Sequence, residues 1–312
     1  MSDIAMMRTT SRIALLTLLF LAGCATQQNY SADGWRQIGR GDHAGALVQF
    51  DRALEDSDSA ELHAGRARAL HLMGDNDAAE AAYAEAIRLD PDNVQWRVGQ
   101  TIVELARGDA EAATRVCDEI LELEPQLAKA HYNRGLAQQL SGNHEAAFAD
   151  FSRAIGIQPD FARAYNSRGV TLAEARRLDA ALEDFAAAAR LAPELAMARA
   201  NSAAAHYALG EIELALTELN DAIRIDRSNP SFYANRGRVY LDLGNPSAAI
   251  AEFEHALALA PGDTRLWRLL AEARSAAGSG GDWGTDEKAT TTRSRVPHTE
   301  TVGSSTALQT RE

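Results

Sequence analysis

The sequence predicts an all-α fold built from a tandem array of helical hairpins, and three observations support this. Similar stretches follow one another along the chain, each starting at a small turn residue or its substitute: Gly41, Gly74, Gly108, Gly142, Arg176, Gly210 and Gly244. From Gly74 onward the interval is 34 residues each time. Alanine is abundant, prolines number only 8, and no alternating strand pattern of useful length is present. This composition favours closely packed helices.

The second half of each unit carries an apolar ladder with helical spacing. Large and small apolar residues recur at i, i+4 and i+7, which places them on one face of a helix. The fourth and seventh units show it most clearly: Ala147, Phe151, Ala154 and Ala249, Phe253, Ala256. The second helix of each unit is therefore predicted to bury this face.

The ends of the helices are marked by turn residues. A Gly-Asp or Gly-Asn pair lies where one helix must stop and the next begins, because Gly tolerates positive φ and Asp or Asn can cap the next helix. Most units close with a proline, which ends the second helix: Pro91, Pro125, Pro159, Pro193 and Pro261. Arg176 replaces a turn glycine and Arg227 replaces a closing proline without breaking the register.

The first helix of each unit carries its own stripe, for example Tyr165, Gly169 and Leu172. The small residue in the middle allows the two helices of a hairpin to cross closely. In the first unit, Asp33 and Gly34 leave no clear stripe, so the sequence does not establish whether that first helix forms.

A 34-residue helix-turn-helix unit with this small, aromatic, alanine and proline pattern resembles the tetratricopeptide repeat, over roughly residues 27–263. The resemblance implies a right-handed α-solenoid of about seven units, with a capping helix at about residues 264–277. Neighbouring units bury each other's apolar faces, so we expect residues 31–277 to form one solenoid domain. The family also implies protein binding without catalysis and without a cofactor.

The N-terminus has the pattern of a secretory signal over residues 1–23, with Arg8 and Arg12 before a short apolar run. The run ends in Leu21-Ala22-Gly23-Cys24, which resembles the bacterial lipobox. The resemblance implies that Cys24 carries lipid, that residues 24–30 are a tether, and that Ala25 directs the protein to the outer membrane. Open alternatives are a cleaved signal with an incidental cysteine and an N-terminal membrane helix.

Charge and composition exclude several classes of function. The net charge is −13, and nearly all of it lies between the signal and the tail, which argues against a nucleic-acid partner. No catalytic motif is present, and the eight histidines are too dispersed for a metal site. We expect Cys117 to be a buried apolar filler. Residues 278–312 are rich in Ser and Thr without helical period, and we expect a disordered tail.

One position of the first helix is arginine in four units: Arg66, Arg134, Arg168 and Arg236. These arginines either form a basic stripe that binds an acidic partner or have a structural role within the fold. In three of the units an acid follows sixteen residues later on the second helix, at Asp150, Asp184 and Glu252. The structural interpretation, an ion pair across each hairpin, is favoured.

The residue before that arginine is Asn133, Ser167, Asn201 and Asn235 in four successive units. In the family this position faces the concave side, where an asparagine ladder can bind an extended peptide. A carboxamide both donates and accepts hydrogen bonds, so it can pair with a peptide group of any sequence. Lys129 and Arg163, four residues upstream of two ladder members, add positive charge to the expected partner-binding site. The alternative is that a surface position merely tolerates asparagine.

The sequence therefore predicts a non-enzymatic scaffold, lipid-anchored in the cell envelope and facing the periplasm, that captures protein segments during assembly of an envelope complex. Bacterial repeat lipoproteins resemble it in this respect. Two other interpretations stay open. The chain could be a homo-oligomeric structural lipoprotein, or a cytoplasmic co-chaperone if the lipobox is incidental.

Overall fold

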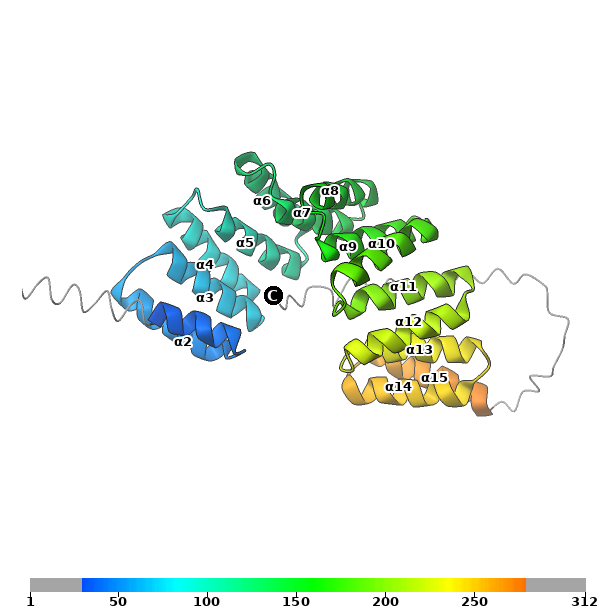
Figure 1. The fold of residues 1–312 in the computed structure, drawn as a ribbon. Helices are drawn as coiled ribbons and strands as arrows, with labels where there is room; N and C mark the ends of the chain where they lie inside the picture. The colour runs from blue at the N-terminus through cyan, green and yellow to red at the C-terminus, as the bar shows by residue number, and fades with distance from the viewer. Residues whose placement is uncertain (1–29, 279–312) are drawn as a thin grey trace, which may run out of the picture. The chain divides into compact units, whose positions relative to one another are not determined.

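The computed structural model describes residues 30–278, and every regular element in this range is an α-helix. Within residues 30–141 and within residues 142–278, helices contact their neighbours in chain order, as expected for stacked hairpins. The predicted signal, tether and lipidated Cys24 lie outside the described residues, as does the tail beyond 278. The described chain divides at Ser141 and Gly142 into two compact units (Figure 1).

The first unit contains a helix over residues 30–39 followed by α2 to α7. Their bounds are α2 His43–Asp56, α3 Ala60–Leu72, α4 Asn76–Leu89, α5 Val94–Arg107, α6 Ala110–Leu123 and α7 Ala128–Leu140. The helix over 30–39 settles the question left open for the first hairpin. Gly34 is its small crossing residue, because a Cβ there would lie 2.7 Å from the Phe50 ring of α2. Trp35 packs edge-on against the same ring.

The second unit contains α8 to α15. Their bounds are α8 His144–Ile157, α9 Ala162–Glu174, α10 Leu178–Leu191, α11 Ala196–Leu209, α12 Ile212–Ile225, α13 Pro230–Asp242, α14 Pro246–Leu259 and α15 Thr264–Gly278. The predicted capping helix at about 264–277 is therefore present as α15. It packs on α14 and α13.

The apolar ladder of the second helices forms the core, as predicted. Phe151, Phe185 and Phe253 are at most 1% exposed, and the alanines beside them are fully buried. Cys117 occupies the same repeat position in α6 and is also fully buried, which confirms its expected place in the core. The closing prolines follow two residues after the end of α4, α6, α8, α10 and α14, as the sequence predicted.

The turn residues also behave largely as predicted. The six turn glycines have φ between 71° and 88°, and Arg176, which replaces a glycine, adopts the same left-handed conformation at φ 60°. Asp42, Asp75, Asp109 and Asn245 each accept a backbone hydrogen bond from the first turn of the following helix. Asn143 was expected to do the same, but it makes no capping hydrogen bond to α8.

Candidate protein-binding surface

The first helices of successive hairpins form a face of each unit. In the first unit α5 contacts both α3 and α7; in the second, α11 contacts α9 and α13, and α13 contacts α15. In the described part of each unit, the second helices of neighbouring hairpins do not contact one another. The first helices therefore lie on the inner side of each stack. We call this surface the first-helix face.

The position of the asparagine ladder lies at the edge of the packing between hairpins. In two earlier hairpins it is Gly65 and Gly99, and a Cβ there would lie 2.4 Å from the ring of Phe50 or Tyr83 on the preceding second helix. Residues with side chains at this position are consequently drawn into the interface. Asn133 is 7% exposed and Ser167 is 8% exposed.

Asn201 and Asn235 are the more accessible ladder residues, and both are half-buried. They lie at equivalent positions of α11 and α13, which contact one another. The Asn201 side-chain amide donates a 2.9 Å hydrogen bond to the Asn166 carboxamide of α9. The Asn235 side chain has no hydrogen-bond partner among the described residues. Asn166 was not identified from the sequence, because no other unit has asparagine at its position.

The two cations predicted beside the ladder are both exposed. Lys129 lies in the first turn of α7 in the first unit, and Arg163 lies in the first turn of α9 in the second. Each lies one helical turn before a ladder residue, Asn133 or Ser167, that is buried. In the second unit, Arg163, Asn201 and Asn235 therefore lie on the consecutive first helices α9, α11 and α13.

The arginine position has the structural role that the sequence favoured. Arg168 forms a two-pronged ion pair with Asp184 across its hairpin, at 2.7 and 2.8 Å, and the Asp184 side chain is only 7% exposed. The hydrogen bonds that Arg168 donates to Asp184 raise the pKa of its guanidinium. Arg236 pairs with Glu252 at 2.9 Å in the same way. Both predicted pairs are confirmed.

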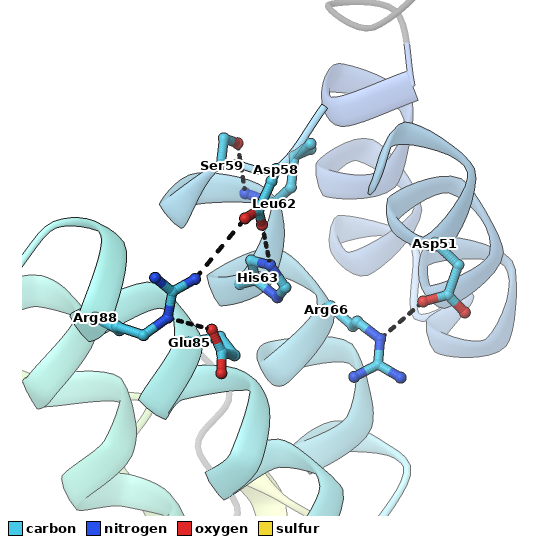
Figure 2. A network of polar contacts seen from close by, with 8 residues as sticks. All are labelled: Asp51, Asp58, Ser59, Leu62, His63, Arg66, Glu85 and Arg88. Atoms are coloured by element: carbon cyan, nitrogen blue, oxygen red, sulfur yellow. Dashed lines mark hydrogen bonds and ion pairs between the residues drawn. The ribbon is translucent and has the colours of Figure 1, made fainter. Parts of the chain in front are cut away.

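The same arginines also reach backward to the preceding second helix. Arg168 donates to Ser152, and Arg236 donates to Asn220. Where a hairpin lacks the acid on its own second helix, this backward contact is the ion pair, as for Arg66 with Asp51 at 2.8 Å (Figure 2). Each arginine therefore fastens one hairpin to the next.

Arg134 follows this backward pattern and pairs with Asp118 of α6 at 2.7 Å. The pair predicted between Arg134 and Asp150 involves residues of different units, and it stays a prediction.

A second polar cluster joins α3 to α4. Figure 2 shows Asp58 between His63 and Arg88, with His63 Nε2 2.7 Å from the Asp58 carboxylate and Arg88 3.8 Å from it. Arg88 also donates to Glu85, and Ser59 caps the start of α3 by accepting from the Leu62 N–H. The histidine is thus held by an acid of the loop that precedes its own helix. No group of three or more His, Cys, Asp or Glu side chains within residues 30–278 could hold a metal ion.

Glu104 of α5 is a buried acid that the sequence does not reveal, because the equivalent positions of other units hold residues as different as Leu70, Gln138 and Tyr240. Its side chain is 2% exposed and lies 3.3 Å from Arg107. Arg107 also pairs with Glu80 and with Asp77 of α4. Burial, reinforced by the negative charge of Glu80, raises the pKa of Glu104 above its usual value.

Glu104→Gln is expected to raise the free energy of unfolding near pH 7 and to change it little at low pH. When the pKa of a group is higher in the folded than in the unfolded state, its contribution to stability is complete below the unfolded-state pKa. That contribution is lost as pH rises through the folded-state pKa. Glutamine does not titrate, so the difference between variant and parent should grow with pH. Urea unfolding at pH 4 and pH 7 measures it, and a variant that loses stability equally at both pH values would contradict the assignment.

Comparisons with known proteins agree with this architecture. Family models described as tetratricopeptide repeat match residues 37–102, 128–161 and 230–273, and one described as TPR repeat matches residues 203–244. A tetratricopeptide repeat protein from Parabacteroides merdae superposes with a TM-score of 0.66 at 16% identity, covering 80% of this chain and 99% of that one. A comparison with curated proteins finds no match.

A chain from the APC/C hetero-tetramer Cut9-Hcn1 also superposes, with a TM-score of 0.68 and 17% identity, covering 78% of this chain and 48% of that one. Fold and repeat together define a helical-hairpin solenoid. The chain is a tetratricopeptide repeat protein, and the family is generally a non-enzymatic scaffold for binding other proteins. None of the helices over residues 30–278 is long and apolar enough to cross a membrane.

Proposed function

We propose that this protein is a non-enzymatic scaffold whose first-helix face in the second unit captures a segment of a partner protein. The observation that carries the proposal is the pair of accessible carboxamides, Asn201 and Asn235, at equivalent positions on the contacting helices α11 and α13. A carboxamide can donate to and accept from a peptide group, so successive carboxamides can bind an extended backbone of any sequence.

Burial divides the predicted ladder into two roles. Asn133 and Ser167 contribute mainly to packing, since each is less than a tenth exposed. Asn201 and Asn235 are the contacts we assign to the partner backbone, and exposed Arg163 supplies positive charge at the α9 end of the same face. Lys129 offers the equivalent charge on α7 of the first unit. A segment with acidic side chains at one end would fit the second unit best.

The membrane part of the proposal rests on the sequence alone. Leu21-Ala22-Gly23-Cys24 resembles the lipobox, so we propose acylation of Cys24 and an outer-membrane location facing the periplasm. Several acyl chains hold a protein at a membrane better than one does. Confinement to a surface would raise the effective concentration of the scaffold for partners there, which suits assembly of an envelope complex.

Crosslinking in cells followed by mass spectrometry tests the binding face. Asn201→Ala/Asn235→Ala should lose the dominant partner of the parent chain, because two backbone contacts disappear while the core is untouched. Gln158→Ala, which removes an exposed carboxamide at the end of α8, serves as the matched control and should retain it. Partners that persist in the double variant would exclude the first-helix face, and crosslinks only between copies would favour a homo-oligomeric structural role.

The anchor is tested separately. Cys24→Ala should abolish the mass added by acylation and release the chain from the membrane fraction. An unchanged mass and fractionation would contradict lipidation and return the cytoplasmic interpretation to consideration.

A further inference from the structure

α15 repeats the register of a first helix, although no second helix follows it among the described residues. It begins 34 residues after α13, so Trp267 is equivalent to Tyr233 and Ala271 to Gly237. Its buried residues Leu266 and Leu270 pack against the preceding hairpin, as first helices do elsewhere. α15 is therefore half of a hairpin.

The equivalent faces of α13 and α15 differ in what covers them. Tyr233 is 7% exposed and its ring packs at a tilt against His255 of α14, with ring centroids 4.2 Å apart. Gly237 lies under Phe253 of α14, since a Cβ there would be 2.7 Å from the ring. Trp267, in contrast, is 54% exposed. We call the uncovered strip of α15 around Trp267 and Ala271 the open face.

The open face is shaped for a helix. Trp267 and Ala271 are one turn apart, and the indole N–H is already bound to the Pro261 carbonyl at 3.1 Å, which holds the ring in place. A small residue beside a fixed aromatic ring is the arrangement by which α13 receives the large side chain of α14. An exposed tryptophan set in this way is a typical anchor for a protein interface.

The charges beside the open face favour an acidic occupant. Arg268 and Arg274 lie beside the strip, with one acid, Glu272, a turn after Arg268, and Arg268 makes no hydrogen bond or ion pair among the described residues. Arg274 reaches back to Glu254 at 2.8 Å. A helix with acidic residues beside an apolar ladder would bring complementary charge to Arg268.

The residues that follow α15 in the sequence do not repeat the apolar ladder of a second helix. The positions 34 residues after the α14 ladder are Trp283, Glu287 and Thr290, which do not repeat it. A symmetric pair of open faces would bring Arg268 of two copies together. Both arguments point to another protein.

We propose that the open face of α15 binds an acidic amphipathic helix of a partner protein, which completes the eighth hairpin in place of a second helix. The site is separate from the first-helix face proposed above. It lies on the side of α15 that faces away from the core, and it recognises a folded helix rather than an extended backbone.

A labelled peptide with the sequence of residues 245–260 provides the probe, because it carries the ladder and acids of α14. Fluorescence anisotropy should show saturable binding to the full chain. Trp267→Glu should weaken binding on the order of tenfold or more, because the anchor is lost and a like charge is introduced. Arg268→Glu should also weaken it, whereas Arg190→Glu, the same charge change at an exposed site of α10, should not.

Circular dichroism checks that each variant stays folded. Absence of saturable binding, or equal binding by Trp267→Glu, would overturn the proposal. So would self-association of the parent that disappears in Trp267→Glu, since a second copy would then be the occupant. The Asn201→Ala/Asn235→Ala variant should bind the peptide as the parent does, which separates this test from that of the first-helix face.

Discussion

Phe253→Ala is expected to lower the free energy of unfolding by about 3–5 kcal/mol. The Phe253 ring is fully buried and packs in one cluster with Tyr233, Leu266 and Leu270, so it joins three helices, α13, α14 and α15. Its removal leaves a cavity that the surrounding helices fill only in part. Urea unfolding followed by circular dichroism measures the loss.

Leu259→Ala in the same helix is the matched control, because Leu259 is 41% exposed. Its loss should be under about 1 kcal/mol, as is usual for exposed positions. Equal losses from the two variants would show that Phe253 does not carry the packing of this hairpin. Since each hairpin is stabilised by its neighbours, α15 is the element expected to separate first in Phe253→Ala.

Asp184→Ala is expected to lower the free energy of unfolding by about 2–4 kcal/mol, because it leaves the Arg168 guanidinium without its main partner. Asp184 is 5% exposed as a residue, and the Arg168 side chain is 21% exposed. Partial contact with water and the bond to Ser152 offset some of the cost. Thermal and urea unfolding of the variant give the value.

The control for this pair is Asp221→Ala. Asp221 and Arg224 form an exposed pair one turn apart in α12, at 3.2 Å, and such pairs contribute about 0–1 kcal/mol. Replacement of both Arg168 and Asp184 by leucine should restore much of the loss, since no uncompensated charge remains. If the single and double variants were equally unstable, the ion pair would not be the cause.

Most of the fold could be predicted because the same sequence pattern recurs in successive repeat units. The 34-residue interval, the ladder ending in Phe151 or Phe253, and the closing prolines each depend on local backbone preference and on helical spacing. The sequence does not establish the helix over residues 30–39, because Asp33 and Gly34 leave no clear apolar stripe there. Only the position of the Phe50 ring shows that Gly34 is the small residue at a close crossing.

The candidate site was less predictable from the sequence. The asparagine ladder could be recognised as a column of equivalent positions, but the burial of each member depends on packing between hairpins, which the column does not show. Asn133 and Ser167 are buried at a position where Asn201 and Asn235 stay half-exposed. Periodicity describes a position, whereas exposure depends on neighbours from another hairpin.

The sequence by itself determined the helical class, the repeat length, the helix ends and the pairing of Arg168 and Arg236 with their acids. These features follow from contacts within one hairpin or from the conformational limits of Gly and Pro. Only the tertiary structure decided which ladder amides are accessible, that Glu104 is a buried acid beside Arg107, and that α15 leaves Trp267 uncovered. These depend on packing between hairpins, where burial and charge are set by residues distant in the chain.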